Sequence, residues 1–498
     1  MATQVNAAHL DSTAVLSRLE HLATATTVFM SMPLVPGITP RILIEKGQKE
    51  NSLDGERTAR YWGIFRPDEI GVPVLDHGLL YGDGVFEGIL VVGDRLFKWR
   101  EHLQRLYSSA QQLQLEIPYS PTALTNHVLE TVRKTAAEGK AATYLRLVVT
   151  RGAGDLGIQP GKCSSGTVYC VASRIQLYPE SLYEHGIHLG LCRKIRRSGA
   201  AILDPQIKSC NYLNNILAWT EASGQGCHEA LMLTQNGYVG EATTDNLFIV
   251  TKDRGWEEDS SKVTIATPVP AYCLNGITRG LVLEYARGLG FRTDECATLL
   301  PTDLLGSDKE VFLTGTAAGL IPVITLDRLP IGNATPGPLT RKLRHMLCED
   351  MENPEMGLSA YASEAEIAVY LDGRECPQGQ MIPIAPDFVR NLFEAIDDRR
   401  WPSLENFFAK DMIYERPGYA PLIGYDRILK FYREERVIAC GRHLLEEIVV
   451  DDDGGACWGR FIGEHKNGSQ IDERFADTYK FENGRVKVRK SYFFRPAI

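Results

Sequence analysis

The sequence has no apolar run long enough to cross a membrane and no dense cluster of basic residues. A membrane-spanning helix needs roughly 18 uninterrupted apolar residues, and no window of the chain approaches that length. The formal net charge is -9, and the lysines and arginines are too scattered to follow a nucleic-acid backbone. We therefore expect no membrane and no nucleic acid among the partners of this protein.

The sequence also lacks the patterns of secretion, disulfide pairing and metal binding. The first thirty residues contain His9, Asp11, Arg18, Glu20 and His21 instead of the apolar stretch of a signal peptide. The 11 cysteines are an odd number and form no repeated Cys-x-x-Cys or Cys/His spacing. We expect reduced thiols, no metal site and a cytoplasmic location.

Length and composition indicate several globular domains. A chain of 498 residues exceeds what one hydrophobic core usually organises, and 44% hydrophobic with 23% charged residues is ordinary for α/β or α+β proteins. We predict an N-terminal extension at 1–58, a main domain at 59–350, a charged linker at 351–384 and a separate C-terminal domain at 385–498.

The main domain alternates strands with fewer helices. Gly93-Asp94 between two apolar runs predicts a hairpin, and Leu103, Leu106 and Ala110 recur at helical spacing. Further strands are expected at 144–150, 167–172, 187–191, 229–233 and 246–250, with helices near 214–222 and 280–289. In the C-terminal domain, a helix at 388–396 precedes strands that form a curled antiparallel sheet.

Lys208 is the first candidate for chemistry. It lies between an apolar segment and a polar turn, where desolvation could lower its pKa and free the amine to form a Schiff base with an aldehyde. Taken alone the signal is weak, because most lysines are solvated surface charges.

Three other stretches supply what a phosphorylated pyridine aldehyde needs. The turn at Gly276 precedes a predicted helix, whose first amides could bind a phosphate. The small residues 314–319 form a second turn, and Glu241 could keep a pyridine nitrogen protonated. Each also has a plain structural reading: a turn glycine, a packing corner and a surface carboxylate.

Together, and in their order, these stretches resemble a known family. The resemblance covers about residues 60 to 350 and is to the class IV aminotransferases, most closely the branched-chain amino-acid aminotransferase subgroup. It is carried by Tyr81-Gly82-Asp83-Gly84-Val85-Phe86-Glu87-Gly88, Arg105-Leu106, Tyr144-Leu145-Arg146, Lys208 with Asn211-Tyr212-Leu213, Glu241-Ala242-Thr243-Thr244-Asp245-Asn246, Gly276-Ile277-Thr278-Arg279 and Thr314-Gly315-Thr316-Ala317-Ala318.

The resemblance implies an α+β fold of type IV, like that of D-amino-acid aminotransferases. A small lobe at about 59–178 and a large lobe at about 179–350 would enclose pyridoxal 5'-phosphate in the cleft between them. A homodimer or higher homo-oligomer is implied, with an amino acid and a 2-oxo acid as substrates.

The resemblance also assigns roles to single residues. Lys208 would form the Schiff base and move the proton between the substrate's α-carbon and the cofactor, while Tyr212 would bind the ring hydroxyl and Glu241 the ring nitrogen. The phosphate would be held by Arg105, Gly276, Ile277, Thr278 and Thr316. The substrate would be bound by Tyr81, Phe86, Tyr144, Arg146 and Ala317, although plain core is an alternative for these aromatic residues.

The sequence departs from the subgroup at one position near the cofactor. Gly319 stands where the subgroup usually has glutamate, which bears on the substrate. We expect transamination of a branched-chain or related apolar amino acid with the glutamate/2-oxoglutarate couple. One alternative is a lyase or another reaction of specialised biosynthesis on the same cofactor. A binding protein without turnover is a third, against which the presence of Lys208 and Glu241 argues.

The C-terminal domain resembles a SnoaL-like member of the nuclear transport factor 2 superfamily, a cone of curved sheet closed by helices. In catalytic relatives a buried acid or histidine acts as general base, and Asp477 is the candidate for a pocket in this domain. The alternative, which we favour, is a paired or surface carboxylate in a domain that only binds or dimerises. His443 and His465 are expected to be structural or exposed.

Overall fold

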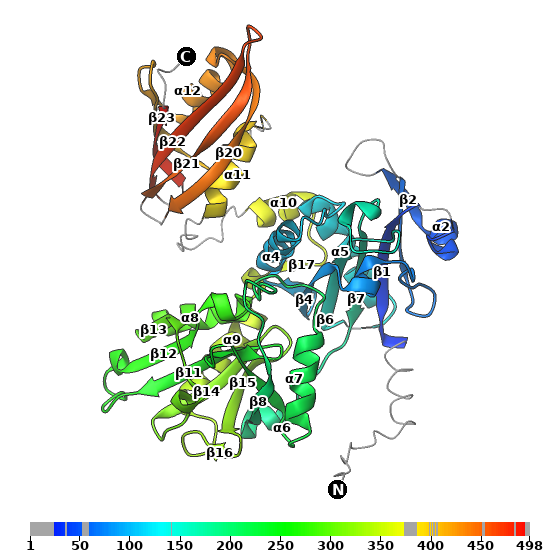
Figure 1. The fold of residues 1–498 in the computed structure, drawn as a ribbon, viewed down its shortest axis with the longest axis vertical. Coiled ribbons are helices and arrows are strands. Elements are labelled where there is room, and N and C mark those ends of the chain that lie inside the picture. Colours follow the sequence, from blue (N-terminus) through cyan, green and yellow to red (C-terminus); the bar gives the residue numbers. More distant parts are fainter. Residues whose placement is uncertain are drawn as a thin grey trace. The chain divides into compact units, whose positions relative to one another are not determined.

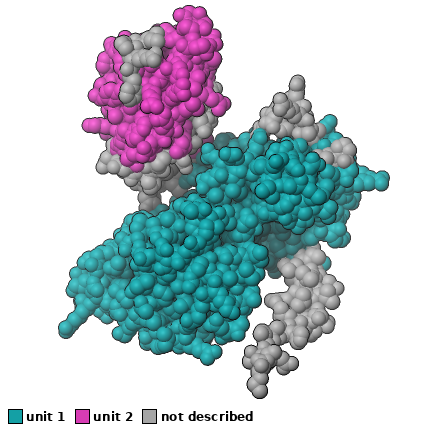
Figure 2. Space-filling view, viewed as in Figure 1, with its two compact units in different colours: residues 1–371 teal, residues 372–498 magenta. Residues whose placement is uncertain are grey.

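The computed structural model describes residues 24–34, 37–51, 59–140, 142–372, 386–397, 399, 401, 404, 407–450, 454–482 and 485–493. The chain divides into two compact units, residues 1–371 and residues 372–498, which are coloured separately in Figure 2. No helix within the described ranges has the length and apolar character that a membrane crossing requires.

The first lobe of residues 1–371 is built on an antiparallel sheet with the strand order β17-β5-β4-β6-β7-β1-β3-β2 (Figure 1). Its strands are β1 (Thr27–Pro33), β2 (Gln48–Asn51), β3 (Ala59–Phe65), β4 (Gly84–Val92), β5 (Arg95–Phe97), β6 (Tyr144–Thr150), β7 (Thr167–Ser173) and β17 (Gly357–Ser359). Its helices are α2 (Arg41–Lys46), α3 (His77–Tyr81), α4 (Trp99–Gln112), α5 (Pro121–Ala137) and α10 (Glu364–Asp372).

The hairpin and the helix expected near the start of this lobe are confirmed. β4 and β5 are antiparallel neighbours, and Gly93 takes the left-handed conformation in the turn between them, with φ +61°. The next element, α4, buries Leu103, Leu106 and Ala110 against the sheet. This packing fixes the helix that carries Arg105.

Residues expected in the N-terminal extension and in the linker belong to the first lobe instead. β1 is buried along its whole length between β7 and β3, and β17 extends the sheet beside β5. Ile367 of α10 is buried in the same core. The lobe therefore includes residues 27–34, 37–51 and 357–371, whereas residues 1–23, 35–36, 52–58 and 373–385 lie outside the described residues.

The second lobe has a mixed sheet with the order β10-β9-β8-β15-β14-β11-β12-β13, and β16 pairs with β15. Its strands are β8 (Ile187–Arg196), β9 (Glu229–Leu233), β10 (Val239–Ala242), β11 (Asn246–Lys252), β12 (Val263–Pro268), β13 (Arg292–Ala297), β14 (Lys309–Gly315), β15 (Gly319–Leu326) and β16 (Leu329–Pro330). Its helices are α6 (Glu180–His185), α7 (Leu213–Ser223), α8 (Ile277–Gly288) and α9 (Pro338–Glu352). The strands and helices expected between residues 144 and 289 are confirmed.

The unit of residues 372–498 has a six-stranded sheet with the order β19-β18-β23-β22-β21-β20, and Figure 1 shows its long strands curving around helices. Its strands are β18 (Phe408–Glu415), β19 (Leu422–Ile423), β20 (Ile438–Val450), β21 (Gly454–His465), β22 (Gln470–Glu482) and β23 (Arg485–Phe493). The expected helix is present as α11 (Pro386–Asp397), and α12 (Tyr425–Lys430) continues into a π-helical turn. Phe393 of α11 and Phe475 of β22 meet in the core, with ring centroids 5.5 Å apart.

Candidate active site

The segment that carries Lys208 is fixed against the first lobe by backbone contacts. It joins β8 to α7, and Ser209 forms an isolated bridge with Val85 at the start of β4. The amide of Phe86 donates a hydrogen bond of 3.0 Å to the carbonyl oxygen of Lys208. Lys208 therefore lies where the second lobe's connecting segment meets the first lobe's sheet.

The Lys208 amine lies at a largely buried site and forms no hydrogen bond or ion pair within the described part of the chain. Its Nζ lies 4.8 Å from the centroid of the Phe86 ring. The residue is partly exposed at a hollow of about 440 Å³, counting the open mouth. Burial of the amine and the nearby charge of Arg105 lower the pKa of Lys208 to about 8, which favours the neutral, nucleophilic form.

Glu241 lines the same hollow from β10 and is held by three donors. Arg197 Nη2 lies 2.6 Å from its Oε1, while the amide of Leu274 and Nδ2 of Asn246 donate to Oε2 at 3.0 and 3.2 Å. Burial raises the pKa of Glu241, and the charge of Arg197 opposes that rise. Glu241 is thus a buried carboxylate that could face a cationic ring nitrogen.

Tyr212 lines this hollow at the start of α7. Its ring meets the Phe86 ring edge to face, with the centroids 5.3 Å apart. Burial raises the pKa of the Tyr212 hydroxyl, so the group remains a hydrogen-bond donor at neutral pH. The structure therefore brings Lys208, Tyr212 and Glu241, the three predicted catalytic residues, to one hollow.

The start of α8 offers backbone amides to an anion. Gly276 is the N-cap, no side chain caps the helix, and the helix begins with Ile277 and Thr278. The first amides of a helix have no partner within it and carry a partial positive charge. A Cβ at Gly276 would come within 2.1 Å of Oδ1 of Asn246, so only glycine allows this close approach.

Arg105 lies beside this helix start. Its Nη1 donates to the carbonyl oxygen of Asn275 at 3.1 Å, and its Nε and Nη2 bind Glu87 at 2.7 and 2.8 Å. His102 Nδ1 lies 2.7 Å from the same carboxylate. Burial alone would raise the pKa of Glu87, but Arg105 and His102 hold it far below its usual range. Three of the five N–H groups of Arg105 are engaged, which leaves two for a phosphate.

The turn between β14 and β15 contains Thr316 and Ala317, both partly exposed. A Cβ at Gly315 would lie 1.8 Å from Oδ1 of Asp245, so the turn packs tightly against this buried acid. The pKa of Asp245 is raised to about 7 by burial and by the charge of Glu229, and it also responds to Lys208. Thr316 and Ala317 therefore lie near the hollow, but they do not line it.

Aromatic and basic residues of the first sheet gather next to Lys208. The guanidinium carbon of Arg146 lies 4.3 Å from the Phe86 ring centroid and 5.8 Å from that of Tyr144. Gly88 stands opposite Arg146 on the neighbouring strand, and a Cβ there would collide with the Tyr144 hydroxyl. Phe86, Tyr144 and Arg146, three of the residues predicted to bind the substrate, thus form one cluster, with the cationic group above an aromatic ring.

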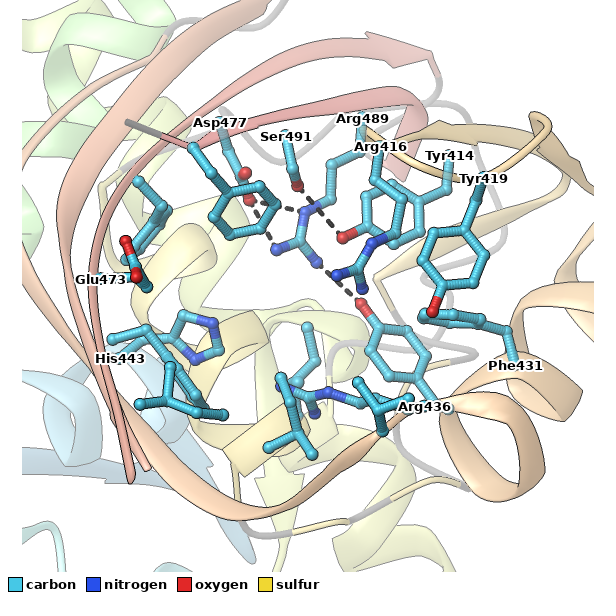
Figure 3. A pocket seen from close by; sticks show the side chains of 18 of the residues that line it. Tyr414, Arg416, Tyr419, Phe431, Arg436, His443, Glu473, Asp477, Arg489 and Ser491 are labelled. Atoms are coloured by element: carbon cyan, nitrogen blue, oxygen red, sulfur yellow. Dashed lines mark hydrogen bonds and ion pairs between the residues drawn. The ribbon is translucent and has the colours of Figure 1, made fainter. Parts of the chain in front are cut away.

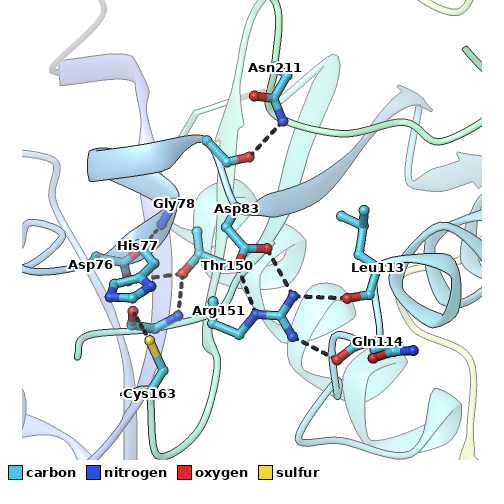
Figure 4. A network of polar contacts seen from close by, with 12 residues as sticks. Asp76, His77, Gly78, Asp83, Leu113, Gln114, Thr150, Arg151, Cys163 and Asn211 are labelled. Atoms are coloured by element: carbon cyan, nitrogen blue, oxygen red, sulfur yellow. Dashed lines mark hydrogen bonds and ion pairs between the residues drawn. The ribbon is translucent and has the colours of Figure 1, made fainter. Parts of the chain in front are cut away.

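Tyr81 ends α3 and is turned away from this cluster. Its hydroxyl accepts a 2.8 Å hydrogen bond from the amide of Gly157, and 37% of the residue is exposed. Figure 4 shows how its segment is anchored: Arg151 binds the Asp83 carboxylate through Nε and Nη2 at 2.9 and 3.0 Å. Asn211, three residues after Lys208, donates to the carbonyl oxygen of Gly82 at 3.0 Å. The structure does not bring Tyr81 to Lys208 within one chain.

The sequence interpretation missed several residues that hold the site. Arg197 and Asn246 bind Glu241, while Glu87 binds Arg105 and is itself bound by His102. Asn246 and Glu87 could have been found, because each stands in a motif that carries the family resemblance. Arg197 and His102 carry no spacing signal, since each pairs with a residue from a different element.

Asp477 lies in the other unit, on β22, and lines a hollow there. The residue is 1% exposed, and Arg489 binds its Oδ2 through Nε at 2.7 Å and Nη2 at 2.5 Å. Oδ1 of Asp477 has no hydrogen-bond partner within the described residues. Of the two histidines expected to be structural, His443 lies 2.5 Å from Asp397, and His465 is buried.

Family models match both parts of the chain. A model described as Amino-transferase class IV matches residues 84–326, and a model described as SnoaL-like domain matches residues 389–489. A putative branched-chain-amino-acid aminotransferase of Methanocaldococcus jannaschii is 41% identical over 273 residues, which are 55% of this chain and 88% of the relative. A D-alanine aminotransferase of Bacillus licheniformis is 32% identical, over 57% of this chain and 93% of the relative.

Solved structures of branched-chain aminotransferases also resemble this chain. The T.th. branched-chain amino acid aminotransferase with pyridoxamine 5'-phosphate superimposes with a TM-score of 0.53 at 30% identity, covering 60% of this chain and 96% of that chain. The fold and site therefore define a two-lobed enzyme of the type that uses pyridoxal 5'-phosphate. The chain belongs to the class IV aminotransferase family and carries a SnoaL-like domain at its C-terminal end.

Proposed function

We propose that this aminotransferase moves amino groups between a branched-chain or related apolar amino acid and the glutamate/2-oxoglutarate couple, with Lys208 as the lysine that holds the cofactor. The observation that carries the proposal is the shared hollow, in which an amine of lowered pKa and the buried carboxylate of Glu241 both take part. Simple ligand holding needs neither group, whereas amino-group transfer needs both.

The residues around the hollow fit pyridoxal 5'-phosphate. Glu241 would hold the ring nitrogen, and Tyr212 would donate to the ring oxygen. The phosphate would be held by Arg105, Ile277, Thr278 and Thr316, with Gly276 allowing its close approach to the helix start. When bound, the cofactor supplies an electron sink for the electrons released at the substrate's α-carbon.

Lys208 is also the group that we assign to proton transfer at the substrate's α-carbon. A pKa of about 8 places its amine near the working pH, where a group can both accept and return a proton. Asp245 and Glu241 lie near enough to influence the ionisation of Lys208. Phe86 covers the amine and helps to exclude water.

The cluster beside Lys208 suits an apolar amino acid. Arg146 offers a charged group for the substrate carboxylate, and the Phe86 and Tyr144 rings offer an apolar wall for its side chain. The proposal gains support from the names of the relatives, since structures of the T.th. branched-chain enzyme include complexes with 4-methylvaleric acid and with N-(5'-phosphopyridoxyl)-L-glutamate. We also assign Ala317, in the turn between β14 and β15, to substrate binding.

A substrate panel with 2-oxoglutarate tests the proposal. The purified enzyme is given L-leucine, L-isoleucine, L-valine and D-alanine separately, and both glutamate and the new 2-oxo acid are measured. We expect equal amounts of the two products, with the branched-chain L-amino acids fastest. Preference for D-alanine would instead indicate a substrate like the one in the name of the Bacillus licheniformis relative. Consumption of an amino acid without glutamate formation would instead favour a lyase.

The position of Gly319 gives the lyase alternative no support. Gly319 has φ +63°, a conformation that L side chains rarely adopt. A Cβ there would face Leu347 and Met351 of α9 at 4.0 Å, in apolar surroundings. The local backbone conformation and packing therefore explain why glycine stands at this position, and a different reaction is not needed to explain it.

A homodimer is part of the proposal. Leu213, Ile216 and Leu217 lie on one face of α7 at helical spacing, and each is exposed by 47% to 68%. An exposed apolar face of this kind is typical of a protein interface, and a second copy of this chain is the occupant we propose. Light scattering should give about twice the 55.4 kDa of one chain, and Ile216→Asp should lower that mass.

A further inference from the structure

The unit of residues 372–498 encloses a hollow of its own, of about 830 Å³ counting the open mouth (Figure 3). Its walls combine aromatic rings, among them Tyr419, Phe461 and Phe493, with cationic side chains. Figure 3 shows the guanidinium groups of Arg416, Arg436 and Arg489 among these rings. An apolar hollow with a few charged groups is the usual form of a small-molecule site.

Each nitrogen of the Arg489 guanidinium binds a protein partner. It binds Asp477 through Nε and Nη2, and its Nη1 donates to the Tyr432 hydroxyl at 3.0 Å. Its guanidinium carbon lies 4.9 Å from the Tyr414 ring centroid. The charges of Arg489 and Asp477 therefore balance, and this pair forms a fixed part of the wall.

Arg416 and Arg436 differ from Arg489, because no described residue forms an ion pair with either of them. The Nε of each is buried without a hydrogen-bond partner in the described parts of the unit. A buried N–H group without an acceptor costs free energy, and a buried guanidinium costs more. Burial lowers the pKa of Arg436, which agrees with a cation that lacks a counter-charge.

Both of these guanidinium groups lie over aromatic rings. The guanidinium carbon of Arg416 lies 5.1 Å from the Tyr419 ring centroid and 5.0 Å from that of Phe431. The corresponding distances from Arg436 are 5.6 Å to Tyr432 and 5.8 Å to Phe461. A guanidinium above an aromatic ring can still donate its N–H groups to an anion.

The acids around the hollow are already engaged. Asp397 binds His443, Asp477 binds Arg489, and Glu473 takes part in an interaction of its own. Burial lowers the pKa of His443, which keeps this side chain uncharged at neutral pH despite Asp397. The hollow thus holds two cations for which the described residues supply no anion.

We propose that this hollow binds an organic acid, with its carboxylate between Arg416 and Arg436 and its aromatic or branched apolar body against the surrounding rings. A carboxylate accepts two parallel hydrogen bonds from one guanidinium and would satisfy the buried Nε groups. The apolar body would be buried against Phe461 and Phe493. This site is separate from the hollow at Lys208 and does not depend on the proposed transamination.

Calorimetric titration of the full-length enzyme, with its cofactor bound, tests this site. The probes are 2-naphthoate, phenylacetate and 4-methylvalerate, with 2-naphthamide as the uncharged counterpart of the first. We expect saturable binding of at least one acid. The affinity for 2-naphthamide should be lower than that for 2-naphthoate by about tenfold or more. No saturable binding of any acid, or equal affinity for the acid and the amide, would overturn the proposal.

Variants place the binding in this unit. Arg416→Gln and Arg436→Gln should each lower the affinity for the acid by about tenfold or more. The affinity of Arg436→Lys should lie between that of Arg436→Gln and that of the parent. Arg433→Gln removes the same charge from an exposed position next to Tyr432 and should leave binding unchanged. Thermal unfolding and near-ultraviolet circular dichroism check that each variant folds. Unchanged affinity in folded Arg416→Gln and Arg436→Gln variants would assign the binding to the hollow at Lys208 and refute the proposal.

Discussion

Arg197 and Glu241 form a buried ion pair, with 2.6 Å between Nη2 of the arginine and Oε1 of the glutamate. Arg197 directly follows β8 and Glu241 lies in β10, so the pair links two parts of the second lobe. Burial raises the pKa of Glu241, and Arg197 is the main group that counters this effect. Arg197 therefore favours the ionised form of the carboxylate that would face the proposed ring nitrogen.

Removal of this charge should slow catalysis. Glu241→Gln keeps the size of the side chain but takes away its charge, and kcat/KM should fall by roughly 10²- to 10³-fold, because the electron sink loses its support. Steady-state kinetics with the best substrate of the panel measures the effect. Glu284→Gln, at an exposed position of α8, is the control and should behave like the parent. If the kinetics of Glu241→Gln were close to those of the parent, the proposed role of Glu241 at the ring nitrogen would be wrong.

Capture of the cofactor should follow the ionisation of Lys208. Only the neutral amine attacks an aldehyde, so the rate of capture by the cofactor-free enzyme should rise with pH and level off above the pKa. That pKa is about 8, because burial and Arg105 lower it. Stopped-flow absorbance between about pH 6 and pH 10 should give a midpoint near 8. A rate that continues to rise toward the ordinary lysine pKa of about 10.4 would contradict the lowered value.

Glu87 should contribute strongly to stability at neutral pH. Glu87→Gln leaves the buried guanidinium of Arg105 without its counter-charge, which should lower the free energy of unfolding by about 3–5 kcal/mol in urea denaturation. Glu138→Gln, at an exposed position, is the control and should change the free energy of unfolding little.

The effect of Glu87 should also depend on pH in a defined direction. Its pKa is lowered in the folded state, so its contribution is complete above the unfolded value of 4.5 and declines as the pH falls below it. The stability difference between the parent and Glu87→Gln should therefore shrink in acid. A difference that grows as the pH falls would contradict the lowered pKa.

Gly276→Ala should weaken the binding of the cofactor phosphate. The new Cβ would overlap Oδ1 of Asn246, and either the helix start or the asparagine that binds Glu241 must move. Gly280→Ala is a matched control on the same helix, because its Cβ meets nothing within 4 Å. Equilibrium titration of the cofactor should show weaker binding for Gly276→Ala alone. Equal affinity of the two variants would argue against a phosphate at the start of α8.

Local patterns in the sequence predicted much of the fold. The β4–β5 hairpin, the buried stripe of α4 and the helix α11 each depend on residues a few positions apart, and each is present. The place of β1 could not be predicted in this way. Its seven residues are buried on both faces between strands that follow it in the chain, so no alternation of apolar and polar residues marks it.

The candidate site shows the same division. Lys208, Tyr212 and Glu241 stand in recognisable motifs, and the structure brings them to one hollow. Arg197 is different, because its partner is 44 residues away in β10 and nothing in its own surroundings indicates the pairing. Tyr81 matches a substrate-binding position of the family, yet its hydroxyl binds Gly157 in the single chain. Pairings of this kind depend on tertiary structure, which local spacing does not encode.

The identity of the lysine that holds the cofactor tests the account most directly. Borohydride reduces the bond between the cofactor and its lysine to a stable one, and mass spectrometry of a protease digest then locates the label. The account predicts loss of the visible absorbance band on reduction, with the label on the peptide that contains Lys208, and neither band nor label in Lys208→Ala. A label on another lysine, or no label on the parent enzyme in the presence of added cofactor, would contradict it.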